Sequence, residues 1–149
     1  MRAVIQRVTR ASVKVNGEVC GGIDGGLVVL LGIARDDSAK DVAYLVEKTI
    51  ALRIFDDEQG RMNRSLLESG GGILIVSQFT LYGDVRRGLR PSWIDAAAPD
   101  LAQPLYDLFV ARTQKSVAQV ATGSFGAEMQ LELVNDGPVT ILLESRKLF

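Results

Sequence analysis

The chain has 149 residues, of which 47% are hydrophobic and 23% charged, proportions typical of a globular protein. This length predicts one domain over residues 1–149 that folds without disulfides or structural zinc. The sequence contains one cysteine and no histidine, which excludes Ser-His-Asp catalysis, imidazole acid/base chemistry and histidine-bearing zinc sites. The 17 Lys and Arg residues nearly balance the 18 Asp and Glu residues, whereas proteins that hold long duplexes through many phosphates are usually basic.

The N-terminal residues do not resemble a targeting signal. Arg7 and Arg10 interrupt the apolar stretch that a signal peptide would need, and no apolar run reaches the roughly 18 residues of a membrane-spanning helix. We therefore expect a cytoplasmic protein. The single cysteine, Cys20, is expected to be a partly buried, unreactive thiol, because no histidine is present to activate it.

The first third of the sequence is predicted to be mostly strand. Asn16-Gly17, between Ser12–Val15 and Glu18–Cys20, predicts a β-hairpin with a two-residue type I′ turn. The uninterrupted apolar run Leu27–Ile33 is typical of a strand covered on both faces. Ser38 is placed to cap a following helix. The inner face of that helix is expected to carry, at helical spacing, Val42, Leu45, Val46 and Thr49.

The next segment combines a polar turn, an apolar strand and a second helix. Asp56–Gly60 is expected to form a hairpin tip, and Ile73–Val76 a second buried strand. Asp100 is predicted to cap the second helix, with Pro104 in its first turn, where a missing N–H costs little. The inner face of this helix is expected to carry Leu101, Leu105, Leu108 and Phe109.

The chain is predicted to close with two strands. Met129–Val134 and Val139–Leu143 lie on either side of an expected turn at Asn135–Pro138. Helices between apolar strands predict crossover connections, while both ends of the chain resemble antiparallel additions. The sequence therefore predicts an α/β fold with mixed β-sheet layers, two main helices packed on one face, and an N-terminal β-hairpin.

The segment Ser77–Asp84 places polar residues directly after a buried strand, where α/β sheets commonly bind ligands. The alternative is an ordinary strand end, whose Ser77 and Thr80 hydroxyls bond to nearby backbone groups. The arginine-bearing loop Gly88–Trp93 follows and contains the only tryptophan. The presence of this loop close to Ser77–Asp84 favours the interpretation as a ligand site.

The segment Asn135–Thr140 holds a Gly-Pro pair between two strands. Such a pair is most often a plain turn, and only about 5–6% of X-Pro bonds in folded proteins are cis. The sequence leaves the isomer open. Gly137 has no side chain, so a ligand can approach its backbone closely, with the carbonyl as a steric wall.

Four strings of residues resemble one known family. They are MRAVIQRV at the start, SQFTLYGD at 77–84, RRGLRPSW at 86–93 and NDGPVT at 135–140. In this order and spacing they resemble the D-aminoacyl-tRNA deacylases, and the resemblance runs from Met1 to the strand after Thr140. The SQ-x-x-L and G-P-V-T elements are specific together, whereas either alone would be weak.

The resemblance implies an enzyme that hydrolyses the ester joining a D-amino acid to the 3′-terminal adenosine of tRNA. This editing reaction would enforce chirality in translation by rejecting L-aminoacyl substrates. Glycine mischarged on tRNA-Ala is an expected further substrate, because a wall that clashes with L side chains cannot exclude an amino acid without one. No metal or other cofactor is expected, and neither a membrane nor DNA is an expected partner.

The resemblance also assigns roles to particular residues. The catalytic pocket would be formed by Ser77, Gln78, Phe79 and Thr80. In the family the Gly-Pro pair, here Gly137-Pro138, is a cis bond that reaches into the partner subunit's site as the chirality filter, which implies a homodimer. The other matched positions are Arg7, which would orient the filter, and Phe125 and Met129, which would help hold the terminal adenosine.

The chemistry of an aminoacyl ester fits a site made largely of backbone. The ester is already activated by its vicinal hydroxyl, so positioning and an oxyanion donor, the backbone N–H of Phe79 or Thr80, could suffice. Thr80 is either a nucleophile or a positioning group, and we favour positioning because the sequence offers no nearby base. The arginines at 86, 87 and 90 are equally consistent with phosphate contacts and with a solvated surface.

Two other classes of protein stay open. One is a non-catalytic ligand-binding or interaction module with the same fold, which the intact SQFT and GPVT strings disfavour. The other is a general esterase or peptidase, against which the missing histidine and the absent G-x-S-x-G motif argue.

Overall fold

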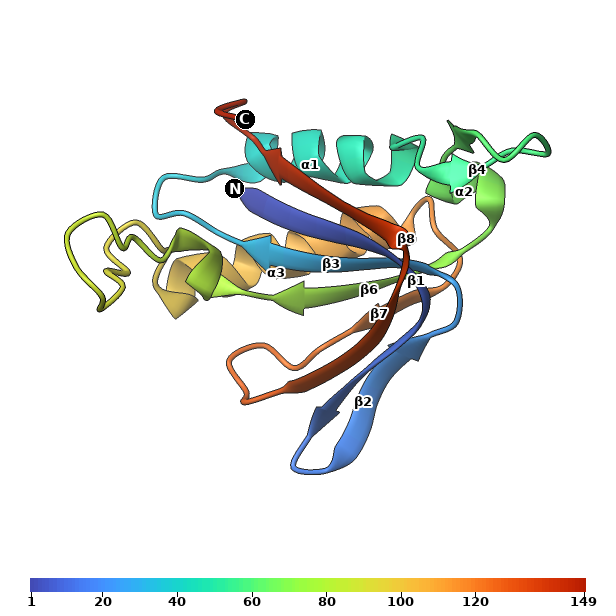
Figure 1. Ribbon diagram of the computed structural model, residues 1–149. Coiled ribbons are helices and arrows are strands. Elements are labelled where there is room, and N and C mark those ends of the chain that lie inside the picture. Colours follow the sequence, from blue (N-terminus) through green and yellow to red (C-terminus); the bar gives the residue numbers. More distant parts are fainter.

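A curved six-stranded β-sheet forms the centre of the structure, a computed structural model that describes residues 1–149 (Figure 1). The strands run in the order β2-β1-β3-β6-β7, and β8 pairs with β1 along nearly its whole length. Their bounds are β1 (Arg2–Val15), β2 (Glu18–Ile23), β3 (Gly26–Gly32), β6 (Gly72–Ser77), β7 (Val120–Thr122) and β8 (Gln130–Glu144).

The strand directions confirm the predicted mixed sheet. Strands β3, β6 and β7 run parallel, and β1 is antiparallel to β2, β3 and β8. Asn16-Gly17 joins β1 to β2 with φ of 50° and 81°, the positive values that a type I′ turn requires. Because the parallel strands end at one edge of the sheet, the segments that follow them meet there.

Two long helices, α1 (Ala39–Ala51) and α3 (Pro99–Gln114), lie side by side against one face of the sheet (Figure 1), as predicted. Ser38 caps α1: its side chain accepts from the N–H of Lys40, and Asp41 completes a capping box. Two shorter helices are α2 (Leu66–Ser69) and the 3-10 helix η1 (Phe79–Tyr82). None of these helices combines the length and the apolar character that crossing a membrane requires.

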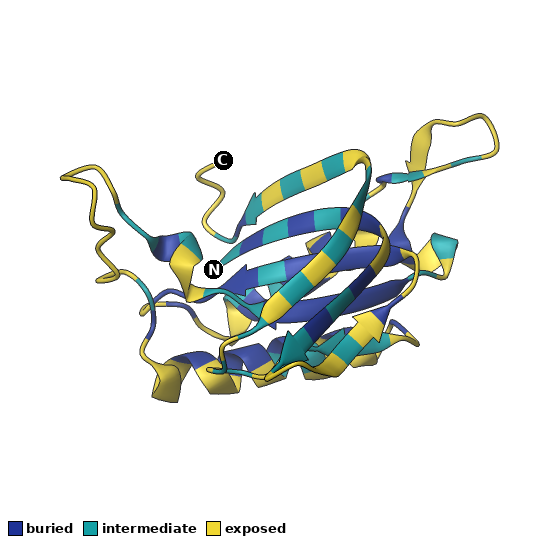
Figure 2. Ribbon diagram, turned by 60° about the horizontal axis from the view of Figure 1, so that its bottom comes forward, coloured by how far each residue is buried: buried dark blue, intermediate teal, exposed yellow.

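Buried side chains fill both faces of the sheet. Toward the helices, Ile5 and Leu27 pack with Phe109 of α3, and on the other face Val28 packs with Leu74. Figure 2 shows the central strands as buried, whereas β8 alternates between half-buried and exposed residues. The long strand β8 therefore presents one row of side chains to solvent.

The second long helix differs from its prediction. It begins at Pro99, so Ala98 takes the N-cap position and Asp100 lies inside the first turn. Pro104 falls in the helix interior, where it cannot donate to the Asp100 carbonyl. Leu101 is 39% exposed because it lies off the inner face. The buried residues of α3 are Ala102, Leu105, Tyr106, Phe109 and Thr113.

The C-terminal strand also differs from its prediction. The two expected strands are one strand, β8, because both halves pair antiparallel with β1. Thr140 pairs with Gln6 and Asn135 with Val8, so β8 advances by five residues where β1 advances by two. The surplus residues form a bulge that contains the Gly-Pro pair, and Pro138 is tolerated there because a bulge needs no ladder N–H.

Two smaller predictions have opposite outcomes. The hairpin tip expected at Asp56–Gly60 is confirmed, because β4 (Phe55–Asp56) and β5 (Met62–Arg64) pair across it. Cys20, expected to be partly buried, is exposed. It lies on β2, the terminal strand in the order of the sheet.

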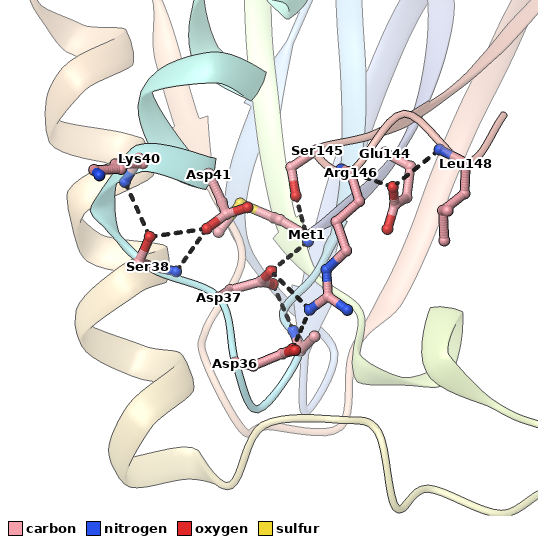
Figure 3. A network of polar contacts seen from close by, with 11 residues as sticks. Met1, Asp36, Asp37, Ser38, Lys40, Asp41, Glu144, Ser145, Arg146 and Leu148 are labelled. Atoms are coloured by element: carbon pink, nitrogen blue, oxygen red, sulfur yellow. Dashed lines mark hydrogen bonds and ion pairs between the residues drawn. The ribbon is translucent and has the colours of Figure 1, made fainter.

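The first residue is tied into the structure by a buried ion pair (Figure 3). The Met1 ammonium lies 2.6 Å from Asp37 Oδ1, and both groups are fully buried. It also donates to Ser145 Oγ at 2.8 Å, while Asp37 Oδ2 accepts from the Ala34 N–H at 2.7 Å. These bonds join the start of β1, the turn before α1 and the end of β8.

Candidate active site

The segment Ser77–Thr80 lies at the edge where the parallel strands end. Strand β6 ends at Ser77, and the chain turns into η1, whose Leu81 N–H donates to the Gln78 carbonyl at 3.3 Å. The Gln78 N–H donates to the Leu31 carbonyl of β3 at 2.8 Å. A Cβ on Gly32 would lie 3.1 Å from the Gln78 carbonyl oxygen, so glycine permits this close packing. The segment is therefore held by two strands of the sheet.

Its side chains are neutral, and two of the four are exposed. The Gln78 side-chain amide donates to the Thr80 hydroxyl, and both Thr80 and Phe79 are exposed. Phe79 packs edge-to-face against Trp93, with ring centroids 5.2 Å apart. The N–H groups of Phe79 and Thr80 lie in the first turn of η1, where a helix offers them no internal acceptor. The segment can therefore donate hydrogen bonds but holds no base.

The loop after β7 places Phe125 and Met129 at the same edge. The loop begins where the Gly123 N–H donates to the Ile75 carbonyl at 3.0 Å. A Cβ on Gly123 would lie 2.6 Å from the Met129 sulfur, so the two residues are in close contact. Phe125 packs on Tyr106 of α3, with ring centroids 5.7 Å apart. The structure thus brings Phe125 and Met129 to the same edge as Ser77–Thr80.

Arg7 is a buried guanidinium with three partners. Its Nη1 donates to the Ile54 carbonyl at 2.7 Å and to Asp56 Oδ1 at 3.4 Å. Its Nε lies 3.1 Å from Asp136 Oδ2. The two groups form an ion pair but not a hydrogen bond, because the angle is unfavourable. Asp136 directly precedes Gly137, so Arg7 links the strand β1 and the β4–β5 hairpin to the bulge of β8.

The Gly137-Pro138 peptide bond, whose isomer the sequence left open, is cis. Both residues are exposed at the tip of the bulge. Gly137 has a φ of 116°, a region that favours glycine. A Cβ added there would lie 2.7 Å from Val139 Cγ2 and 3.1 Å from Arg7 Nη2. The structure therefore brings Arg7 and Gly137 together, in contact.

The two groups of predicted site residues lie at opposite ends of the sheet within one chain. Arg7 pairs with Leu27 of β3, whereas Ser77 pairs with Leu31. A strand advances about 3.3 Å per residue, so these positions are separated by about 13 Å along β3. In Figure 1 the bend of β8 and the arrowhead of β6 accordingly lie on opposite sides.

Beyond the helix η1, the chain forms a loop over residues 84–92 that is closed by backbone hydrogen bonds at its two ends. Asp84 and Ser92 exchange two backbone hydrogen bonds of 2.9 Å. The Arg86 guanidinium bonds to Asp84 at 2.7 Å and holds the pKa of that carboxyl well below its usual range. Arg87 and Arg90 are exposed and make no ion pair within the chain. Their guanidinium groups are therefore accessible from solvent.

Several residues of the two regions carry no predicted role. The sequence predicts a hairpin tip that contains Asp56 and a turn that contains Asp136, and both residues contact Arg7. Asn135 donates to two backbone carbonyls. The string NDGPVT contains Asn135 and Asp136, so membership of that string was the available signal. The structure contains no group of three or more His, Cys, Asp or Glu side chains placed to hold a metal ion.

Comparison with known proteins assigns the family. The model of the D-Tyr-tRNA(Tyr) deacylase family matches residues 4–144. The D-aminoacyl-tRNA deacylase of Thermosipho africanus (strain TCF52B) is 58% identical over 149 residues, covering 100% of both chains. That of Symbiobacterium thermophilum is 57% identical, covering 100% of this chain and 99% of its own. The chain belongs to the D-Tyr-tRNA(Tyr) deacylase family, as its motifs predicted.

Solved structures share the fold of this chain. A c-Myc DNA unwinding element binding protein superposes with a TM-score of 0.92 at 43% identity, covering 97% of this chain and 98% of its own. A probable eukaryotic D-amino acid tRNA deacylase superposes with a TM-score of 0.80 at 21% identity, covering 95% and 97% of the two chains. The second comparison shows the shared fold.

Proposed function

We propose that this protein is a D-aminoacyl-tRNA deacylase, which hydrolyses the ester between a D-amino acid and the 3′-terminal adenosine of tRNA. Full-length relatives named for this activity, 58% identical in the first case, support the reaction class. The observation in the structure that carries the proposal is the Gln78–Thr80 segment. It offers a hydroxyl and unpaired N–H groups at a strand end, beside an exposed aromatic ring.

The proposed reaction needs little from side chains. Water attacks the ester carbonyl, the bond to the ribose 3′-oxygen breaks, and that oxygen leaves with a proton, assisted by the vicinal 2′-hydroxyl of the tRNA. The N–H of Phe79 or Thr80 donates to the oxyanion, a contact typically worth about 10²–10³ in rate. The Thr80 hydroxyl accepts from Gln78 and has no base beside it, so its proposed role is to position the substrate.

The proposed chirality filter is the backbone at Gly137-Pro138. Discriminating two enantiomers by one methylene-sized contact would yield only about 1–3 kcal/mol. A rigid backbone wall that clashes with every L side chain rejects more strongly. Arg7, in contact with Gly137 and paired with Asp136, is proposed to hold that wall in place. Such a wall admits glycine, so glycine mischarged on tRNA-Ala is a proposed further substrate.

A homodimer is proposed because one chain does not bring its two motifs together. Gly137 and Pro138 are exposed at the edge opposite to Ser77–Thr80. In the proposed dimer each bulge reaches into the partner subunit's pocket. Exposed apolar side chains on β8, Val134 and Leu142, are available to the same interface.

The remaining parts of the proposed substrate site surround the pocket. Phe125 and Met129 are proposed to hold the terminal adenosine, because they lie at the edge of Ser77. Arg87 and Arg90 are proposed to contact phosphates of the acceptor stem, since the loop that carries them starts beside Phe79 and Trp93. We place the protein in the cytoplasm, where aminoacylated tRNA is used.

The direct test is to incubate the purified protein with D- and L-tyrosyl-tRNA and to follow free tyrosine. Release from the D substrate alone is expected. Release from both would contradict the chirality filter, and release from neither would favour a ligand-binding module. Glycyl-tRNA-Ala is the third substrate: if it stays intact at enzyme concentrations that clear D-tyrosyl-tRNA, exclusion by a wall is the wrong mechanism.

The dimer is tested by mixing two inactive variants. Gly137→Val damages the bulge, and Gln78→Ala damages the pocket. Co-refolded subunits are expected to regain deacylation, because a hybrid pair contains one intact pocket facing one intact bulge. If both motifs act within one chain, the mixture stays inactive.

A further inference from the structure

We infer that Asn135 is a positioning residue for the chirality filter, a role that rests on the proposed function. Its side-chain amide donates to two backbone carbonyls, that of Arg7 and that of Val139, each at 3.0 Å. Arg7 is 128 residues away in sequence, whereas Val139 lies on the far side of the Gly-Pro pair. One side-chain amide therefore joins the two ends of the bulge to each other and to β1.

The β1–β8 ladder shows why a side chain is needed at this point. Gln6 pairs with Thr140 and Val8 with Asn135, but neither Arg7 nor Val139 has a partner in this pairing. Their carbonyls would lack donors from the opposite strand. Backbone carbonyls that are shielded from water need a hydrogen-bond donor, and the Asn135 amide supplies one to each.

The hydrogen bonds made at position 135 require the functional groups of asparagine. The position uses two donors, and the Asn135 oxygen additionally receives a contact from the Thr140 hydroxyl at 3.4 Å. A carboxylate has no donor and would face two carbonyl oxygens, while a hydroxyl has only one donor. A glutamine supplies the same groups one methylene further from the backbone. Asparagine thus matches the position in both chemistry and reach.

The same bonds connect Asn135 to the filter on two sides. The Arg7 carbonyl accepts from Asn135, while the Arg7 guanidinium pairs with Asp136 and lies beside Gly137. With Val139 also held by Asn135, Gly137-Pro138 lies between two fixed ends. Loss of the amide is therefore expected to move the Gly137 carbonyl relative to the substrate, and misplacement by about 1 Å can cost about 10²-fold in rate.

The experiment compares Asn135→Ala and Asn135→Asp with wild type on D- and L-tyrosyl-tRNA. We expect the ratio of D to L turnover to fall by about 10-fold or more. The KM for D-tyrosyl-tRNA should change by less than about two-fold, because the residues proposed to grip the RNA lie elsewhere. Asn135→Gln keeps both donors and is expected to recover part of the D to L ratio. It also serves as the control if the Ala and Asp variants fail to fold.

A stability control separates positioning from a purely structural role. Thr113→Ala removes a buried hydrogen bond to the Phe109 carbonyl within α3, far from the bulge in sequence. It should lower Tm without changing the D to L ratio. If the Asn135 variants lower Tm and also leave the ratio unchanged, Asn135 is structural only and the inference is wrong. Absence of activity in wild type would instead overturn the proposed function itself.

Discussion

The guanidinium of Arg7 lies directly against Gly137, with Nη2 3.1 Å from the point where a Cβ on that glycine would stand. The same arginine bonds to the Ile54 carbonyl and pairs with Asp56 and Asp136. This buried guanidinium therefore joins a backbone carbonyl, two carboxylates and the backbone at Gly137 at one point. This contact motivates the first prediction.

Gly137→Ala is expected to fold but to lose at least about 10-fold in turnover of D-tyrosyl-tRNA. The added methyl meets Val139 and Arg7, and a φ of 116° strains any residue with a Cβ, at a cost of about 1–3 kcal/mol. Single-turnover deacylation and thermal unfolding measure the two effects. The matched control is Gly60→Ala, because Gly60 also has a positive φ of 73° but a Cβ added to it would meet nothing within 4 Å. Equal activity losses in both variants would contradict the role of Gly137.

Thr80→Ala is expected to keep measurable turnover, reduced by about 10–100-fold, with Thr80→Ser close to wild type. In the proposed mechanism the hydroxyl, which accepts a hydrogen bond from Gln78, positions the substrate and is not the nucleophile. Rapid-quench measurement on D-tyrosyl-tRNA, together with a binding assay, checks this. Complete loss of turnover with unchanged binding would identify Thr80 as the nucleophile.

Substitution of Arg87 or Arg90 by Gln is expected to weaken tRNA binding and to make it less sensitive to salt. Removing one cation that meets a phosphate lowers the slope of log K against log salt by about 1. Titration of D-tyrosyl-tRNA binding at several salt concentrations gives the slope. Lys115→Gln, an exposed cation at the end of α3, is the control, and an identical slope change there would mean that the arginines have no particular place on the RNA.

Asp37→Asn is expected to destabilise the fold by about 3–5 kcal/mol, because it leaves the buried Met1 ammonium without its counter-charge. Chemical denaturation measures the change. Asp36→Asn is the neighbouring control: Asp36 is largely exposed and pairs with Arg146 at the surface, where such pairs contribute about 0–1 kcal/mol. Similar losses in the two variants would show that burial of the Met1–Asp37 pair is not what stabilises the structure.

The sequence was a good guide wherever structure depends on neighbouring residues. The Asn16-Gly17 turn, the Ser38 cap and the Ile73–Val76 strand each follow from a few adjacent side chains, and the structure has all three. The start of α3 shows the limit of such signals. Asp100 is a good cap by type, but Pro99 already occupies the first helical position, where its fixed φ suits the helix.

Local sequence patterns do not predict which strands pair over long distances in the chain. Asn135–Pro138 contains the residues of a turn, yet it forms a bulge because both flanking segments pair with the same strand, β1. The hydrogen bond between Asn135 and the Arg7 carbonyl joins two residues that are 128 positions apart. No local spacing of residue types in the sequence indicates such a contact. The motif strings name the predicted site residues, whereas only the sheet register shows that Arg7 and Gly137 lie apart from Ser77–Thr80.

That separation has a kinetic consequence. Because Ser77 and Gly137 occupy opposite ends of one sheet, the catalytic unit in the proposed dimer is assembled by a bimolecular encounter. Well below the dissociation constant of the pair, the initial rate would rise with the square of the subunit concentration, and above it linearly. Expression level would then control proofreading more steeply than it controls an enzyme whose site is complete in each chain.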